Sequence, residues 1–251
     1  METWRLIRTI ETDGARQMAI DEAILTHRIK GEVPNTLRFF TWKPECLTIG
    51  YFQDLDKEVD TERARTLGVD IVRRYTGGGA VFHDDELTYS LAVSEQDVPQ
   101  DIIGSYEAIC GAITKGLERA GVHAEFRPVN DIVVNNKKIS GNAQTRKEGV
   151  VLQHGTVLVD VDVKKLFSLL RVSDEKMKGQ MIKTVEERVT SLSSELGRPV
   201  SMDELQDSLI AGFEEAFDVR FEERGLTESE LSLAEELRAE KYSTKEWREL
   251  R

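Results

Sequence analysis

The sequence predicts an α+β fold in which helices flank a mixed β-sheet. Short β-rich runs alternate with amphipathic runs through the first half of the chain, and four β-rich runs follow one another between residues 124 and 161. From residue 163 onward, apolar residues recur at helical spacing instead. Such segregation of strands and helices is typical of α+β proteins. No stretch of linker composition divides the chain, so we expect a single domain over residues 1–251.

The elements of the first half follow from periodicity and turn residues. Gly31 ends the first helix, Gly121 ends a long amphipathic helix that begins near Pro99, and Lys43-Pro44-Glu45 signals a hairpin. We expect strands over residues 4–7, 37–42, 46–52, 69–73, 80–82 and 87–93, and helices over residues 15–30, 60–67 and 99–120.

In the second half, capping residues mark two of the helices. Ser201 with Glu204 predicts one capping box, and Thr227 with Glu230 predicts another. We expect strands over residues 124–127, 131–134, 138–145 and 150–161, and helices over residues 163–170, 174–178, 202–216 and 227–241.

The composition favours a cytoplasmic protein that binds neither nucleic acid nor membranes. Asp and Glu number 46 against 34 for Lys and Arg, and the formal net charge of −12 disfavours nucleic-acid binding through bulk charge. No apolar run approaches the roughly 20 residues that span a bilayer, and the N-terminus does not resemble a signal peptide. Cys46 and Cys110 predict buried free thiols in a reducing compartment, and four histidines without paired Cys/His spacing give no zinc site.

Residues 73–84 contain the strongest local signal, three consecutive glycines between two β-rich runs and next to Arg73 and Arg74. Glycine tolerates positive φ and has no Cβ, so successive backbone N–H groups can converge on one anion. An arginine beside them would add a forked, permanently charged donor. The stretch predicts a receptor for a phosphate or a carboxylate, and the alternative is a flexible hairpin with solvated arginines.

Three further segments combine polar residues with β structure, namely Asn130-Asp131, residues 137–143 and residues 153–156. Since the strands between them can form a meander, we expect Lys138 and His154 to face one cavity with the glycine turn. Backbone amides, an arginine and a lysine without an evident nucleophile and base indicate electrostatic handling of anions. Activation of a carboxylic acid by ATP needs this, because two anions must approach each other. Lys138 would bridge the carboxylate and the phosphate.

Together these segments resemble the lipoate-protein ligase A family of the biotin/lipoate protein ligase superfamily. The resemblance extends from the first strand to the last helix. It rests on residues 73–84 (RRYTGGGAVFHD), 130–131 (ND), 138–143 (KISGNA), 154–156 (HGT), 188–192 (RVTSL) and 241–247 (KYSTKEW).

The resemblance implies a biotin/lipoate-ligase-like fold and a two-step reaction. Lipoate and Mg-ATP would form lipoyl-AMP and release pyrophosphate. The ε-amine of a lysine on an acceptor protein, of the glycine cleavage H protein or 2-oxoacid dehydrogenase E2 type, would then attack the acyl carbon. ATP and Mg²⁺ are thus the implied cofactors and lipoate the substrate.

The resemblance also implies roles for individual residues. Lys138 would be catalytic and would contact the carboxyl and α-phosphate oxygens, Asp131 would hold the metal ion, and residues 183–188 would form a loop that closes over the adenylate. The residues implied to bind the substrate and cofactor are Arg74, Gly77, Gly78, Gly79, Ala80, Phe82, His83, Asn130, Asp131, Ser140, Gly141, His154, Thr156, Lys183 and Arg188. Phe39, Ile49 and Val81 are expected walls for the fatty chain or plain core.

Complete ligases of this family carry a smaller accessory domain after the large one, and this chain stops at Arg251. Archaeal-type ligases resemble the present sequence and supply that domain as a separate polypeptide. We therefore expect a partner subunit to be required for efficient adenylation.

Two alternatives remain. Octanoyl or lipoyl transferases of the same superfamily move an acyl chain between carrier proteins, and residues 140–155 are similar to theirs. Their chemistry needs a cysteine just before the strand that begins at Asp131, where this sequence has Arg127-Pro128-Val129-Asn130. A non-catalytic subunit that binds lipoyl domains is the second alternative.

Overall fold

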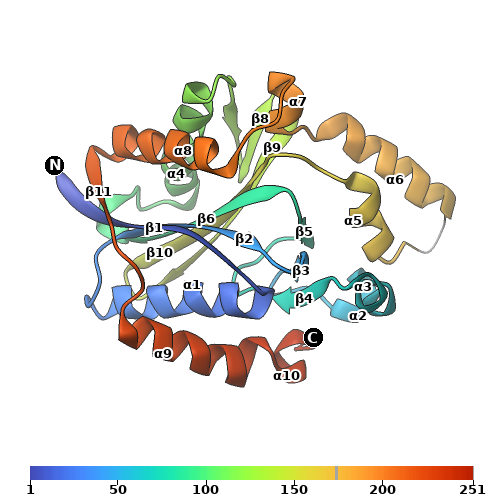
Figure 1. Ribbon diagram of the computed structural model, residues 1–251, viewed down its shortest axis with the longest axis horizontal. Coiled ribbons are helices and arrows are strands. Elements are labelled where there is room, and N and C mark those ends of the chain that lie inside the picture. Colours follow the sequence, from blue (N-terminus) through green and yellow to red (C-terminus); the bar gives the residue numbers. More distant parts are fainter. Residues whose placement is uncertain (173–174, 251) are drawn as a thin grey trace.

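Two β-sheets organise the chain in the computed structural model, which describes residues 1–172 and 175–250 (Figure 1). The large sheet has the order β11-β1-β2-β6-β10-β9-β8-β7, and the small sheet has the order β4-β3-β5. The strands are β1 Glu2–Thr12, β2 Thr36–Trp42, β3 Cys46–Ile49, β4 Asp70–Arg73, β5 Val81–His83, β6 Glu86–Ser94, β7 Glu125–Arg127, β8 Asp131–Val134, β9 Lys137–Lys147, β10 Val150–Leu158 and β11 Val219–Glu223.

Helices cover both faces of the large sheet (Figure 1). On one face α4 Ile102–Arg119 packs against α8 Met202–Phe217, and on the other α1 Gly14–Ile29 packs against α9 Glu228–Leu237. The remaining helical segments are α2 Leu55–Glu58, α3 Thr61–Leu67, α5 Val163–Leu169, α6 Glu175–Arg188, α7 Leu192–Leu196, α10 Lys245–Arg248, the 3₁₀ turn η1 Glu95–Asp97 and the π turn η2 Arg238–Tyr242.

Alternating side chains of the central strands fill two cores, one on each face. On β6, Leu87, Tyr89, Leu91 and Val93 join the core beneath α4 and α8, while Ala92 joins the core beneath α1 and α9. Successive strand residues point to opposite faces, so one strand serves both layers. A third apolar cluster lies under the small sheet. The small sheet thereby stands as a separate layer beside the large one.

The structure confirms the predicted α+β fold with a mixed sheet flanked by helices. The meander of β8, β9 and β10 is also as predicted, because each pairs antiparallel with the next. Thr227 and Glu230 form the predicted capping box. Ser201 caps α8 by accepting from the Glu204 N–H. The Glu204 carboxylate pairs with Arg198 instead of the Ser201 N–H, so this capping box is incomplete.

Three of the predicted elements are corrected. Lys43-Pro44-Glu45 does not make a hairpin, because β2 belongs to the large sheet and β3 to the small one. The glycines do not join paired strands either, because β4 and β5 lie on opposite sides of β3. The expected helix over residues 174–178 is the start of the longer α6, and Asp174 lies outside the described residues. Strand β11, which pairs in parallel with β1, had no predicted counterpart.

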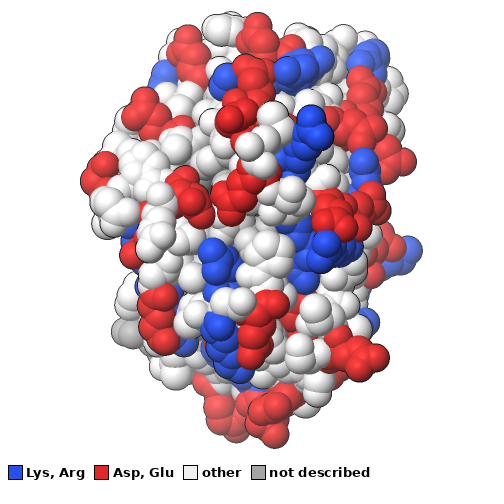
Figure 2. All heavy atoms as spheres, turned by 90° about the vertical axis from the view of Figure 1, so that its left-hand side faces the viewer, with Lys and Arg blue, Asp and Glu red and all other residues white. Residues whose placement is uncertain are grey.

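Acidic and basic side chains intermingle on the face shown in Figure 2. Within residues 1–172 and 175–250, no helix combines the length and the apolar character needed to cross a membrane.

Candidate active site

A cavity of about 330 Å³ lies where the small sheet meets β9, β10 and the helices α5 and α6. It brings together most of the residues that the sequence analysis singled out. The predicted site residues on its wall are Arg74, Gly78, Gly79, Ala80, Phe82, His83, Asn130, Lys138, Gly141, His154 and Thr156. Lys138, His154 and the glycine turn, called the glycine segment from here on and comprising residues 76–80, therefore face one cavity, as predicted.

Arg74 shapes the glycine segment from beneath. Its Nη2 donates to the carbonyls of Gly77 at 2.7 Å and Gly79 at 2.8 Å, and its Nη1 donates to Thr48 Oγ1 at 3.1 Å. Burial lowers the pKa of Arg74 to about 10, and no carboxylate contacts it among the described residues. The N–H groups of the three glycines make no hydrogen bond within that part of the chain. The site thus offers an uncompensated cation and unused donors, which suit an anion.

Arg73, in contrast, is a structural residue. It is fully buried, and its guanidinium donates to backbone carbonyls of the loop after β3 and of the helix α10. These carbonyls belong to Gly50, Tyr51, Gln53, Trp247 and Arg248.

Glycine is required at two positions of this region. Gly78 has φ +97°, and a Cβ there would lie 2.8 Å from Arg74 Nη2. A Cβ on Gly50 would lie 2.0 Å from the Gly78 carbonyl oxygen. Close backbone packing and a left-handed conformation therefore fix the segment.

We predict that Gly78→Ala destabilises the protein more than Gly79→Ala. A Cβ on Gly79 meets nothing within 4 Å, so this variant is the matched control. The free energy of unfolding, measured by chemical denaturation, should fall by about 1–2 kcal/mol more for Gly78→Ala, because only Gly78 has a positive φ. Equal losses in the two variants would contradict the assigned backbone geometry.

Lys138 lies at the β9 side of the cavity beside Asp131. The ammonium nitrogen is 2.6 Å from Asp131 Oδ1, and the two side chains are 41% and 36% exposed. A Cβ on Gly141 would lie 2.8 Å from Lys138 Nζ, so glycine leaves room for the lysine. An exposed pair of this kind adds little stability, which leaves Lys138 available to a stronger anion.

Asn130 is held by a reciprocal pair of hydrogen bonds with Asn142. Asn130 Nδ2 donates to the Asn142 carbonyl at 2.6 Å, and Asn142 Nδ2 donates to the Asn130 carbonyl at 2.9 Å. The hydroxyl of Tyr89 donates to Asn142 Oδ1 at 2.7 Å and accepts from Gln153 at 2.7 Å. This buried network fixes the turn that places Asn130 on the cavity wall.

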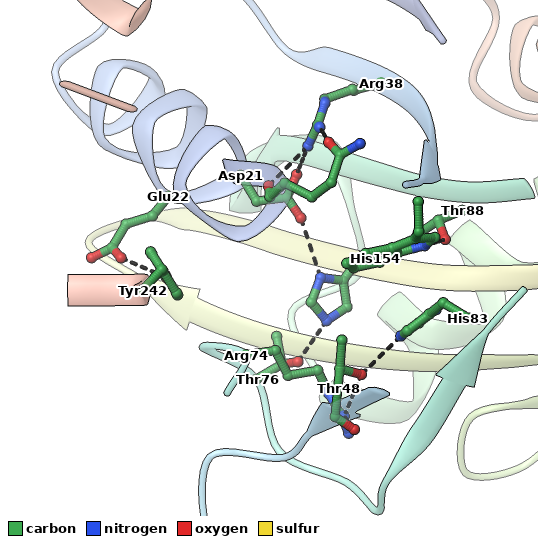
Figure 3. Close-up of polar contacts among 12 residues, drawn as sticks. Asp21, Glu22, Arg38, Thr48, Arg74, Thr76, His83, Thr88, His154 and Tyr242 are labelled. Atoms are coloured by element: carbon green, nitrogen blue, oxygen red, sulfur yellow. Dashed lines mark hydrogen bonds and ion pairs between the residues drawn. The ribbon is translucent and has the colours of Figure 1, made fainter. Parts of the chain in front are cut away.

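His154 joins the glycine segment to a buried ion pair (Figure 3). Its Nε2 lies 2.6 Å from Thr76 Oγ1 and its Nδ1 lies 3.3 Å from Asp21 Oδ2, while Asp21 Oδ1 accepts from Arg38 at 2.6 Å. Burial lowers the pKa of His154. Burial opposes ionisation of Asp21, but Arg38 and His154 outweigh it and hold the pKa of Asp21 below its ordinary value. The lowered pKa of Asp21 favours the carboxylate, and the lowered pKa of His154 favours the neutral imidazole.

His83 makes a second contact of the same kind. Its Nδ1 lies 2.5 Å from Glu86 Oε1, and its Nε2 lies 2.8 Å from Thr48 Oγ1. The ring stacks on Trp42 at 4.1 Å between centroids. Thr88 Oγ1 donates to the same Glu86 oxygen at 2.7 Å and accepts from the Trp42 indole at 2.8 Å. Both cavity histidines are thus oriented by buried carboxylates.

Several predicted site residues lie off the cavity wall. Lys183 and Arg188 are exposed residues of the helix α6, so the predicted closing loop is wrong; α6 lines the cavity through Val185 instead. The helical spacing of residues 175–188 favours a helix over a loop. The other residues away from the wall are Gly77, Asp131, Ser140, Phe39 and Ile49, of which Ser140, Phe39 and Ile49 are fully buried. Val81 lines the cavity, and its role as a wall for the fatty chain stays a prediction.

The sequence analysis did not assign site roles to Trp42, Thr48 and Asn142, which line the cavity. Asn142 lies inside a recognised motif, so its position gave a signal. Trp42 and Thr48 lie in ordinary β-rich runs, and only the packing of the small sheet on the large one brings them to the cavity. Glu86 is buried behind His83 and had no sequence signal beyond its place after Asp84-Asp85.

A cluster of acidic residues, Glu45, Asp84 and Asp85, borders the cavity near α5. Burial raises the pKa of Asp84 to about 6, Glu45 and Asp85 add to this rise, and Lys165 opposes it. Lys165 pairs with Glu45 and lies 5.5 Å from the centre of the Phe82 ring. The group connects α5 to the small sheet.

We predict that Asp84→Asn gains stability relative to the wild type as the pH rises. A carboxyl whose pKa is raised on folding contributes stability below its ordinary value of 3.8, and this contribution is lost as the pH rises through about 6. Asparagine cannot ionise, so the variant keeps its stability. Unfolding by urea at pH 5 and pH 7.5 should show this change, and a difference that does not depend on pH would contradict it.

Neither cysteine lines the cavity. Cys46 is fully buried on β3, and burial raises its pKa well above the ordinary value. Cys110 lies on α4 with its sulfur 3.7 Å from Gln153 Nε2, and burial raises its pKa to about 12. Cysteine nucleophiles act as thiolates in accessible surroundings, so both environments disfavour that role.

The family model described as the lipoyl protein ligase A/B catalytic domain matches residues 13–214. The chain belongs to this family. It therefore carries a catalytic domain of the lipoate and biotin ligase superfamily, which confirms the resemblance drawn from the motifs.

Curated relatives of similar length carry a transferase name. The octanoyltransferase LipM of Clostridioides difficile is 39% identical over 100% of both chains, and that of Kyrpidia tusciae is 41% identical over 98% of each. These names agree with the acyl-transfer alternative better than with an ATP-dependent ligase.

Similar solved structures include ligases. A chain from an archaeal bi-partite lipoate protein ligase, studied with its E2 lipoyl domain from Thermoplasma acidophilum, has a TM-score of 0.92 and 36% identity, and covers 100% of this chain and 98% of that one. Lipoate-protein ligase A bound with ATP gives 0.85 and 35% over 99% of each chain. The similar proteins therefore carry names of two kinds, octanoyltransferase and lipoate-protein ligase.

Proposed function

We propose that this chain, over residues 1–251, is the catalytic subunit of an ATP-dependent lipoate-protein ligase. The observation that carries the proposal is the composition of the cavity wall. It contains two cations, Arg74 and Lys138, and a glycine segment with unused N–H groups, and it contains no cysteine among the described residues. Such a cavity can bring a carboxylate to a phosphate but offers no thiolate for an acyl-enzyme.

In the first step, a carboxylate oxygen of lipoate attacks the α-phosphate of ATP, and pyrophosphate leaves. The carboxylate is already ionised at neutral pH, so no base is needed. Repulsion between the two anions is the main obstacle, and Lys138 and Arg74 reduce it. In the second step, the amine of an acceptor lysine attacks the acyl carbon and AMP leaves. The polar part of the cavity wall suits the phosphate of lipoyl-AMP, and the apolar part suits its acyl chain.

The implied Mg²⁺ fits a site shared with the nucleotide. The described residues contain no group of three or more His, Cys, Asp or Glu side chains that could hold a metal ion. Mg²⁺ usually binds one or two carboxylates together with substrate phosphates, and it would screen their charge here. We assign Asp131 as the protein ligand, because its carboxylate lies 2.6 Å from the ammonium of Lys138, which lines the cavity.

The second candidate is octanoyl transfer between carrier proteins, which the names of the curated relatives favour. It would require one of the two buried cysteines to reach the acyl group, or a nucleophile of another kind.

ATP dependence separates the two candidates. The protein would be incubated with lipoate, ATP, Mg²⁺ and an apo lipoyl domain, and separately with octanoylated carrier protein without ATP. The ligase predicts pyrophosphate release and a lipoyl-lysine product only in the first reaction. ATP-independent transfer alone would overturn it and support the transferase.

Because one similar structure is of a bi-partite ligase, each reaction would be run with and without a candidate accessory subunit. We expect the accessory subunit to accelerate adenylate formation. Acceptor proteins of the H-protein and E2 types would be compared in the same assay.

A further inference from the structure

Arg74 and Glu86 are two buried ionisable side chains, and among the described residues no carboxylate contacts Arg74 and no lysine or arginine contacts Glu86. The Arg74 guanidinium contacts carbonyls and a hydroxyl, and Glu86 is 1% exposed with Oε2 unpartnered in the described part of the chain. A buried, isolated charge is costly unless another charge compensates it. Hydrogen bonds that connect the two side chains would therefore stabilise both of them.

Thr48 and His83 provide that link, and Figure 3 shows both of them with Arg74. Arg74 Nη1 donates to Thr48 Oγ1 at 3.1 Å, Thr48 Oγ1 lies 2.8 Å from His83 Nε2, and His83 Nδ1 lies 2.5 Å from Glu86 Oε1. A carboxylate only accepts, so His83 Nδ1 donates to Glu86. In the neutral ring with its proton on Nδ1, Nε2 accepts from the Thr48 hydroxyl. All three hydrogen bonds then run in one direction, from the cation to the carboxylate, and each polarises the next.

These three hydrogen bonds form a relay between Glu86 and Arg74, and Arg74 in turn contacts the glycine segment. The other nitrogen of the same guanidinium, Nη2, holds the carbonyls of Gly77 and Gly79. The orientation of the Arg74 fork is therefore set on one side by Thr48 and on the other by the glycines. Nη1 also lies 3.4 Å from the Thr48 carbonyl oxygen, so loss of the Thr48 hydroxyl would leave Nη1 with only this longer contact to hold the fork.

We propose that Glu86 is a positioning residue that acts through His83 and Thr48 to hold Arg74 in its anion-binding orientation. The proposal rests on the proposed function in one respect, because it takes the carboxylate of lipoate as the anion. It assigns Glu86 and Thr48 an effect on recognition of that carboxylate and none on recognition of the acyl chain.

The test compares lipoate with lipoamide, its neutral amide, in direct binding titrations without ATP. Glu86→Gln removes the charge at constant shape, and Thr48→Val removes the hydroxyl without changing any buried charge. Glu230→Gln is the matched control, because it removes a buried carboxylate paired with Arg5 at a site that does not line the cavity. Thermal unfolding would be recorded for each variant, and Thr48→Val decides the question if Glu86→Gln does not fold.

We expect both relay variants to raise the Kd for lipoate about tenfold, the size of one charge-assisted hydrogen bond, and to leave the Kd for lipoamide within about twofold. Glu230→Gln should keep the wild-type ratio of the two constants. In addition, nitrogen-15 spectra of the histidine side chains should show wild-type His83 protonated on Nδ1.

Equal weakening of both ligands, no weakening, or a His83 ring protonated on Nε2 alone would overturn the relay. So would a wild-type protein that does not distinguish lipoate from lipoamide. Failure of the proposed ligase activity has a different signature, namely intact discrimination of lipoate from lipoamide with no ATP-dependent adenylate.

Discussion

Lys138→Ala is expected to lower lipoate-dependent pyrophosphate release by about a thousandfold, the upper range for loss of one preorganised cation or donor at a developing charge. The loss should lie in kcat, because the ammonium acts where the carboxylate and the α-phosphate meet. The fold should be retained, since the pair with Asp131 is 41% and 36% exposed and contributes little.

Lys137→Ala is the matched control. Lys137 is the preceding residue of β9, it is exposed, and it does not line the cavity. Its variant should release pyrophosphate at the wild-type rate. Wild-type rates from Lys138→Ala would remove that residue from the mechanism.

Arg74→Lys should lose about a hundredfold in kcat/KM for lipoate, although it keeps the charge. A lysine ammonium cannot reach Thr48 and the carbonyls of both Gly77 and Gly79 at once, so the glycine segment loses its support. We expect most of the loss in KM. Steady-state kinetics with varied lipoate would measure it.

The control for this prediction is Arg198→Lys, which alters an exposed arginine paired with Glu204. Its kinetics should match the wild type. An Arg74→Lys variant with unchanged KM would show that a point charge is sufficient and that the fork geometry is not needed.

Local patterns predicted the strands and helices well because each depends on near neighbours. The meander of β8 to β10 and the cap at Thr227 follow from alternation and from a four-residue motif. The pairing of β3 with both β4 and β5 does not, since it depends on contacts between distant segments. For the same reason local patterns predict a hairpin at Pro44, although the turn carries the chain from one sheet to the other.

The candidate site likewise contains residues that sequence motifs reveal and residues that only the fold reveals. Motifs identified Arg74, Lys138 and His154, whose residue types carry chemistry by themselves. Thr48 and Glu86 remained hidden because their importance comes from what they contact. The full length of the helix over residues 175–188 is also not predicted, because the family resemblance implies a closing loop over residues 183–188.

We propose that lipoate is activated as an adenylate in a cavity without a cysteine. The most direct test is a variant carrying Cys46→Ala and Cys110→Ala, which removes both cysteines of the chain. The product of lipoate, ATP, Mg²⁺ and an apo lipoyl domain would be followed by mass spectrometry. We expect this variant to form lipoyl-AMP and lipoyl-lysine at the rates of the wild type. Loss of the product in a folded variant, together with transfer by the wild type when ATP is left out, would contradict it.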